Sequence, residues 1–292
     1  MELRQVEHFL AVAQDGSFTA AAQRIHIAQS ALSASIRRLE AELGAQLFER
    51  TTRRVVLTDA GRALLPVAHR LVADIETARG EVAAVAGLSR GRVAVGTIQT
   101  LTVVDLPKEL GVFRGTYPGI QVHVRDGTVP DLVTAVTSGE LDLAFLAADG
   151  RLPSELVCFA QWRQLLVLVT YPGHRLADQR RVRLPEIDDE PFVEYTGSVM
   201  REMVVRRFAD TGVRLNPVCG ATHVPLLMDL VAAGLGVSIV PKSVAERAGL
   251  PYADIDQVDF SRTIYLAGRQ PEPVNPAARA LLAHLLERAA VS

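Results

Sequence analysis

The chain has 292 residues, of which 49% are hydrophobic and 22% are charged, and its formal net charge is −2. This composition excludes a disordered chain and predicts a globular protein of two or three domains. Because the net charge is close to zero, any surface for nucleic acid must be local rather than a property of the whole chain.

The N-terminal stretch MELRQVEHFLAVAQDG interrupts its apolar positions with charged residues, so we expect no secretory signal peptide. No later stretch approaches the roughly 20 apolar residues that a membrane helix requires. The two cysteines, Cys158 and Cys219, lie far apart in the sequence. This spacing fits a reducing compartment, and we expect both as buried thiols. The sequence therefore predicts a cytoplasmic protein that makes no membrane contact.

Residues 1–58 predict three short helices followed by a hairpin. The first helix has one apolar stripe and ends at the Asp-Gly pair before Ser17, which can N-cap the second helix. The third helix, QSALSASIRRLEAELG, has one apolar side at helical spacing and ends at Gly44. Its apolar residues are Leu32, Ile36, Leu39 and Leu43. The segment QLFERTTRRVVLT then alternates as a two-stranded hairpin does.

Small and basic side chains occupy the opposite side of the third helix. An ordinary solvated surface has the same pattern, so periodicity alone leaves two alternatives open. The clustered arginines of ERTTRR favour DNA, because such a hairpin tip suits phosphate or minor-groove contacts. A helix in the major groove also needs short side chains and hydrogen-bond donors. We therefore predict DNA contacts from Gln29, Ser30, Ser33, Ala34, Arg37, Arg38, Arg50, Arg53 and Arg54.

Residues 59–88 predict one long helix. Thr58 is a plausible N-cap and Gly87 a plausible end. Apolar residues recur at alternating steps of four and three, which is the heptad pattern of two long helices packed along a seam. The alternative is a single long helix buried against its own domain. The heptad residues are Leu64, Ala68, Leu71, Ile75, Ala78, Val82 and Val85.

Residues 89–292 alternate short apolar runs with helical segments, which predicts an α/β domain with largely parallel sheets. Some two hundred residues exceed what one such sheet needs, so we expect two subdomains. Open α/β sheets bind ligands where strand ends face helix N-termini, and free N–H groups there favour an anion. Thr128, Thr196, and Thr222 with His223 stand at such positions. Each threonine could equally be a structural N-cap.

Signals for catalysis are weak. The chain contains no G-x-S-x-G elbow, no H-E-x-x-H motif and no complete phosphate-binding glycine pattern. Cys219 and His223 are four residues apart, which could indicate a thiol and a base or two metal ligands. We expect them to straddle a strand end and a helix start, which favours a structural role. The sequence therefore predicts no catalytic residue, no metal and no cofactor.

The run GSFTAAAQRIHIAQSALSASIRRLEAELGAQLFERTTRRVVLTDAGRALLP resembles the winged helix-turn-helix and linker helix of the LysR-type transcriptional regulators. The later stretch LVAAGLGVSIVPKS resembles a recurrent part of the effector domain of that family, and the resemblance extends over essentially the whole chain. It implies a homo-oligomeric regulator, at least a dimer and up to a homotetramer built as a dimer of dimers, that binds double-stranded promoter DNA and contacts RNA polymerase. It also implies a C-terminal domain built like a periplasmic binding protein.

The resemblance implies three regions: a winged helix-turn-helix at 1–58, a linker helix at 59–88 and an effector domain at 89–292. The effector domain would comprise subdomain I, about 89–163 and 265–292, and subdomain II, about 164–264. The chain would cross between these Rossmann-like subdomains near Gln164 and Arg262. A small polar or carboxylate-bearing effector would bind between them. By resemblance Thr97, Gln99 and Thr100 line this cleft, together with Thr128, Thr196, Thr222 and His223.

The chain departs from the family pattern in the third helix. Ala28 stands where the family commonly has Ser or Thr, so the usual capping hydroxyl is missing. Ala34 and Ser35 replace a pair that is commonly large and polar, which removes the typical base contacts there.

Two other functions compete with a regulator. One is a small-molecule binding module or transporter component, and the other is an α/β enzyme acting through Cys219.

Overall fold

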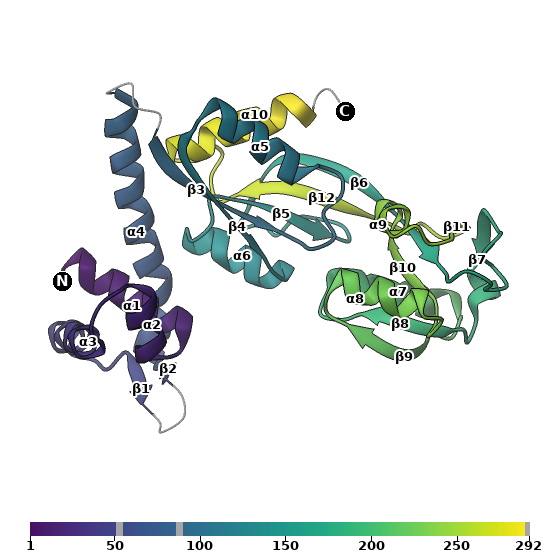
Figure 1. Cartoon of the computed structure of the whole chain (residues 1–292), viewed down its shortest axis with the longest axis horizontal. Coiled ribbons are helices and arrows are strands. Elements are labelled where there is room, and N and C mark those ends of the chain that lie inside the picture. The colour runs from purple at the N-terminus through teal and green to yellow at the C-terminus, as the bar shows by residue number, and fades with distance from the viewer. Residues whose placement is uncertain (51–54, 86–89, 290–292) are drawn as a thin grey trace.

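A long helix, α4 (Asp59–Val85), joins a helical N-terminal domain to a larger α/β region in the computed structural model (Figure 1). The structure describes residues 1–50, 55–85 and 90–289. Buried apolar side chains form three separate cores, one within residues 6–68, one within 93–285 and one within 166–260. The α/β region thus has two halves, each packed around its own core.

The N-terminal domain is the predicted helix-turn-helix with a hairpin. Its elements are α1 (Leu3–Asp15), α2 (Phe18–Arg24), α3 (Gln29–Leu43) and the antiparallel strands β1 (Phe48–Arg50) and β2 (Val55–Leu57). The hydroxyl of Ser17 accepts the Ala20 N–H at 3.3 Å, and Gly44 ends α3 in the left-handed region at φ 67°. Both end signals predicted from the sequence are confirmed.

The core of this domain is aromatic and aliphatic. Phe48 packs against Phe9 and Phe18 with ring centroids 5.4 and 5.8 Å apart, and the α3 residues Leu32, Ile36 and Leu39 are fully buried beside them. Leu43 was expected to share this core but is 42% exposed. The core ends one turn before α3 does, so the last apolar residue of the stripe lies in the open.

Helix α4 begins at the predicted residue. The Thr58 hydroxyl accepts the Gly61 N–H at 3.0 Å and donates to the Gln46 carbonyl at 2.7 Å, so one side chain caps α4 and fixes it to the segment before β1. The heptad stripe is covered unevenly: Ala68 is buried, whereas Val82 is 72% exposed. The predicted end at Gly87 lies outside the described residues. Within a single chain, the stripe is therefore open to solvent at Ala78 and Val82.

The α/β region combines a curled eight-stranded sheet with a two-stranded one. The larger sheet has the order β4-β3-β5-β12-β6-β11-β7, with β10 also paired to β6, and the smaller consists of β8 and β9. The strands are β3 (Arg90–Thr97), β4 (Gly119–Asp126), β5 (Leu143–Ala148), β6 (Val157–Val169), β7 (Arg181–Arg183), β8 (Pro191–Tyr195), β9 (Asn216–Ala221), β10 (Ser238–Pro241), β11 (Tyr252–Asp256) and β12 (Ser261–Gly268).

Helices cover both halves of this region (Figure 1). They are α5 (Leu106–Thr116), α6 (Val129–Ser138) and α10 (Pro276–Ala289) around the first core, and α7 (Val199–Thr211), α8 (Val224–Ala232) and α9 (Lys242–Ala248) around the second, with a 3-10 turn, η1, at Leu184–Ile187. Over the described ranges, no helix is both long and apolar enough to cross a membrane.

The prediction of largely parallel sheets is only partly right. Strands β4, β3 and β5 are mutually parallel, as are β8 and β9. Strands β6 and β12 are instead antiparallel to each other, and β12 is also antiparallel to β5. The physical reason is their path: β6 and β12 carry the chain between the two halves in opposite directions (Figure 1). In their register, Gln164 lies opposite Arg262.

The cysteine prediction is wrong for Cys158. Its side chain is exposed, and Cys219 is half-buried, so neither is a fully buried thiol. Alternation along β6 turns Cys158 away from the core, while its neighbour Phe159 packs against that core. Both cysteines are free.

We predict opposite effects for two glycine-to-alanine substitutions in helices. A Cβ at Gly61 in α4 would meet the Leu47 carbonyl oxygen at 2.2 Å, whereas a Cβ at Gly111 in α5 meets nothing within 4 Å. Gly61→Ala should therefore lower the free energy of unfolding by roughly 1–3 kcal/mol. Gly111→Ala should raise it by roughly 0.5–1 kcal/mol. Urea denaturation of both variants measures this, and equal effects would contradict the close packing of α4 on the hairpin.

Candidate functional site

One face of α3 is open to solvent. Gln29, Ser30, Arg37 and Arg38 are exposed on it, and Ala34 is half-buried. Ser33 is only 8% exposed, because it lies beside Ile36 at the edge of the buried stripe. Its hydroxyl is therefore not on the open face, contrary to the sequence-based expectation. The open face presents an amide, a hydroxyl and two guanidinium groups around small side chains.

The start of α3 lacks a side-chain cap, as the alanine at position 28 requires. Ala28 occupies the N-cap position in extended conformation and no side-chain hydrogen bond forms there. The carbonyl of Ala28 accepts the N–H groups of Ala31 and Leu32. The first N–H groups of a helix have no partner within it, and together with the helix dipole they favour a phosphate. The exposed end of α3 is therefore suited to a DNA backbone.

Glu40 fixes the hairpin to α3, a role that the sequence did not indicate. Its Oε1 accepts the Leu47 N–H at 2.9 Å and the Phe48 N–H at 3.4 Å. Glu40 lies in α3 and its partners lie beyond the turn that follows the helix, so neither helical nor strand periodicity indicates the contact. Two other parts of the predicted surface, the side chain of Arg50 and residues 51–54 with Arg53 and Arg54, lie outside the described residues.

A cavity of about 280 Å³ lies between the two halves of the α/β region. It is bounded by the segment after β3, by the starts of α6, α7 and α8, and by the start of β12. Six of the seven residues predicted for the effector line it: Gln99, Thr100, Thr128, Thr196, Thr222 and His223. The seventh, Thr97, lines a separate and more open hollow of about 920 Å³ beside α5 and α9, because its position at the end of β3 turns it toward that side.

The threonines play different local roles. Thr128 caps α6, since its hydroxyl accepts the Asp131 N–H at 3.4 Å while donating to Asp131 Oδ2 at 2.6 Å. Thr196 does not cap α7, so the alternative of a structural N-cap is excluded for it; its hydroxyl donates to the Ala221 carbonyl at 3.2 Å. Ser198 is the cap instead, because a turn through Gly197 at φ 69° separates Thr196 from the helix.

Gln99 connects the two sides of the cavity. Its Nε2 donates to Asp126 Oδ2 at 3.0 Å and lies 3.3 Å from His223 Nδ1, while its Oε1 accepts the Tyr195 hydroxyl proton at 3.2 Å. Burial raises the pKa of Tyr195 despite the opposing effect of nearby Arg262, so the phenol stays protonated and can donate.

Arg262 was not predicted as a site residue, yet it lines the cavity. Its side chain is nearly enclosed, at 4% exposure. Nε donates to Gln164 Oε1 at 2.7 Å, and Nη2 donates to Thr100 Oγ1 at 2.5 Å. Burial lowers the pKa of Arg262 to about 10, so it still carries its charge at neutral pH. A single arginine within the apolar strand SRTIYLAG was the sequence signal for it.

Metal chemistry finds no support in the described part of the chain. No group of three or more His, Cys, Asp or Glu side chains there is arranged to hold a metal ion. Cys219 is not among the residues that line the cavity, although His223 is. The polar groups on the cavity wall are hydroxyl, amide, imidazole and guanidinium groups and the carboxylate of Asp131.

A helix-turn-helix with a hairpin, joined by a long helix to two α/β halves around a cavity, defines a ligand-responsive DNA-binding protein. Residues 3–62 match the family model described as "Bacterial regulatory helix-turn-helix protein, lysR family", and residues 86–290 match "LysR substrate binding domain". The chain belongs to the LysR family of bacterial transcriptional regulators. It is a DNA-binding regulator with an effector-binding domain.

Individual relatives agree with this assignment. The chain is 29% identical to the "RuBisCO operon transcriptional regulator" of Allochromatium vinosum, over 99% of this chain and 97% of that protein. It is 35% identical to "HTH-type transcriptional regulator ShiR" of Corynebacterium glutamicum, over 82% of each. The structure of full-length CbnR complexed with its target DNA superposes with a TM-score of 0.68, at 26% identity, over 98% of this chain and 99% of that chain.

We predict that Arg37 and Ser33 differ in their effect on DNA binding, although they stand one turn apart on α3. Arg37→Ala should weaken binding to the DNA upstream of the gene by about 1–3 kcal/mol, because it removes an exposed guanidinium from the open face. Ser33→Ala should leave the affinity nearly unchanged, because that hydroxyl is buried. Gel-shift titrations at fixed salt measure both, and an unchanged affinity in Arg37→Ala would remove that residue from the interface.

Proposed function

We propose that this LysR-type regulator binds dyad-symmetric promoter DNA through α3 and the β1–β2 hairpin, and that a small polar or carboxylate-bearing effector binds in the 280 Å³ cavity. The observation that carries the proposal is that two separately packed halves contribute opposite walls to one cavity. A molecule bound there contacts both halves, so its binding favours one relative placement of them.

For the DNA surface, we propose the exposed residues Gln29, Ser30, Arg37 and Arg38 with Ala34, together with the arginines of the hairpin. The solved CbnR complex with its target DNA supports this choice at the level of the family. Two copies related by a two-fold axis would place two α3 helices in half-sites one or more helical turns apart. The proposed regions of the chain are 1–58 for DNA, 59–88 for pairing of protomers and 89–292 for the effector.

For the assembly, we propose that α4 pairs two protomers and that two such pairs form a tetramer. The heptad stripe supports this, because Val82 on its second half is 72% exposed in the single chain. Effector binding would then change the spacing of the DNA-binding pairs and the contact with RNA polymerase. A regulator with this role works where the bacterial DNA is, in the cytoplasm.

A catalytic role has less support than regulation. The strongest candidate for a catalytic pair in the sequence is Cys219 with His223, but only His223 lines the cavity. We therefore propose that the cavity senses a ligand rather than converting it. A transporter component is disfavoured by the N-terminal domain, which matches a regulatory helix-turn-helix family.

We predict that Thr196→Val and Thr100→Val each weaken the effector response while DNA binding survives. Each removes a cavity hydroxyl, a loss of roughly 0.5–1.5 kcal/mol per hydrogen bond. A thermal-shift screen of metabolites on the full chain would supply the effector, and gel shifts with and without it would measure the response. Thr134→Val, on the exposed side of α6, is the control. A normal response in both cavity variants would overturn the assignment of this cavity.

We predict that Val82→Glu lowers the oligomeric state. A charge in the exposed half of the stripe should separate paired α4 helices, whereas Ala63→Glu, exposed on α4 outside the stripe, should not. Light scattering coupled to gel filtration gives the molar mass of each variant. If Val82→Glu keeps the molar mass of the unmodified protein, α4 does not pair the protomers through this stripe.

A further inference from the structure

Arg262 is a buried cation without a counterion. Its side chain is 4% exposed, and it forms no ion pair with a carboxylate in the part of the chain that the structure describes. The titratable group that opposes the effect of burial on the pKa of Arg262 is the phenol of Tyr195, which stays protonated and uncharged at neutral pH. Removing an ion from water without a partner is unfavourable by several kcal/mol. Such a residue is best explained when a negatively charged group reaches it from outside the chain.

The guanidinium has one nitrogen left for such a group. Nε donates to Gln164, and Nη2 donates to the hydroxyl and carbonyl of Thr100. Nη1 makes no hydrogen bond to any described residue. Every fully enclosed side-chain nitrogen or oxygen of the described residues does have a partner, so Nη1 must reach accessible space. Arg262 lines the cavity, and Nη1 is the atom that can donate a hydrogen bond to a ligand there.

We propose that the effector carries a single carboxylate and that Arg262 is the residue that selects it, through Nη1. This inference rests on the proposed function of the cavity and narrows the class of its ligand. Thr100 and Gln164 hold the guanidinium in a fixed plane, which suits the planar oxygens of a carboxylate. The N-termini of α6 and α7 border the same cavity and favour the same charge.

The remaining lining argues for one negative charge rather than two. Asp131 is the sole carboxylate among the described residues that line the cavity, and it would repel a second anionic group. Elsewhere on the wall, Gln99, Tyr195 and His223 offer hydrogen bonds, and Ile98, Val129, Ala147 and Val199 offer apolar surface. At about 280 Å³, the cavity is at the small end of ligand sites. A small monocarboxylic acid with neutral polar groups fits these walls.

The same arginine belongs to the contacts between the two halves. Gln164, which holds Arg262, also donates to Thr102 Oγ1 at 2.8 Å, and Ser243 at the start of α9 donates to Thr102 at 2.6 Å. A carboxylate on Nη1 would therefore bind to a network that includes both connecting strands and a helix of the second half. Arg262 would therefore both recognise the acid and pass its binding on to the contacts between the two halves.

The first test uses small acids and their amides on the full chain. Acetate, propionate and lactate should raise the melting temperature above that in sodium chloride at equal ionic strength, because a ligand that binds the folded state stabilises it. Acetamide, propionamide and lactamide keep the shape without the charge and should not. If no acid exceeds both chloride and its own amide, the carboxylate inference is overturned.

The second test removes the arginine. Arg262→Gln should weaken acid binding by roughly 30-fold or more, as expected when one partner of a buried charge pair is lost. Arg163→Gln is the matched control: this arginine is exposed on neighbouring β6, pairs with Asp259 and does not line the cavity. Equal acid binding by Arg262→Gln and the unmodified protein would show that Arg262 is not the anchor.

A third variant keeps Arg262 and its partners intact, which guards against a folding defect in Arg262→Gln. Val199 is the first residue of α7 and lines the cavity. Val199→Glu would place a carboxylate at a helix N-terminus, where a negative charge is favourable, on the wall of the cavity that Arg262 also lines. It should abolish stabilisation by the acids, whereas Val199→Gln, of equal size, should keep it. If both variants respond to acids alike, the inference is wrong.

These outcomes separate the inference from the function on which it rests. If Thr196→Val abolishes the effector response but Arg262→Gln leaves acid binding intact, the cavity is the effector site and Arg262 is not its selector. If acids bind through Arg262 while the effector response survives Thr100→Val and Thr196→Val, the anion site is real and the proposed effector site is wrong.

Discussion

The pairing of β6 with β12 is the constraint on which the α/β region depends. These two strands pass between the halves in opposite directions and are hydrogen-bonded along their length. Near the start of β12, Gln164 faces Arg262, and their side chains are joined by a 2.7 Å hydrogen bond. Each half packs around its own core, so β6 and β12 are the strands that connect one half to the other. The cavity lies at that meeting point.

A second set of contacts joins the helix-turn-helix domain and α4 into one unit. Glu40 binds the backbone at the start of β1, and Thr58 binds Gln46 while it caps α4. Gly61 allows the backbone of α4 to approach the Leu47 carbonyl, where a side chain would collide. A movement of α4 must therefore carry α3 and the hairpin with it.

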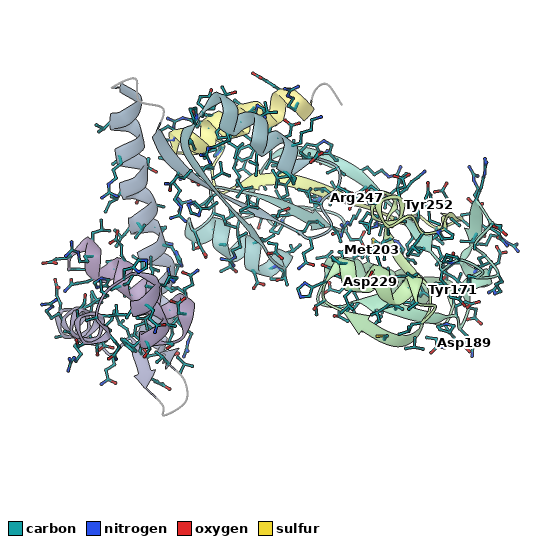
Figure 2. All side chains as sticks on the ribbon, viewed as in Figure 1. Tyr171, Asp189, Met203, Asp229, Arg247 and Tyr252 are labelled. Atoms are coloured by element: carbon teal, nitrogen blue, oxygen red, sulfur yellow. The ribbon has the colours of Figure 1, made fainter. Side chains whose placement is uncertain are left out.

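Helix α6 lies between the cavity and α4. Its capping residue, Thr128, lines the cavity, and Glu140, just beyond its other end, lies 3.8 Å from the ring of His69 on α4. Burial lowers the pKa of His69, so the ring is neutral at neutral pH. Figure 2 shows the side chains that fill the space between the elements, with the labelled residues of the second half, such as Met203 and Asp229, well away from α4. The half that contains α6 is thus the one in contact with the DNA-binding unit.

The sequence by itself determined the features that depend on residues close together in the chain. The caps at Ser17 and Thr58, the stop at Gly44, the order of helices and hairpin, and the family all followed from periodicity, from residue types at helix ends and from the quoted motifs. Six of seven residues predicted for the cavity also line it, because strand ends and helix starts meet at one edge of an open sheet.

Only the tertiary structure decided what depends on which side of an element faces the core. It placed Ser33 inside, Leu43 and Cys158 outside, and Thr97 in a neighbouring hollow. It also made Arg262 a cavity residue, since a strand pattern cannot say that its one arginine is enclosed by residues distant in sequence. The hydrogen bond from Arg262 to Thr100 joins residues that are 162 positions apart, and no local pattern encodes such a contact.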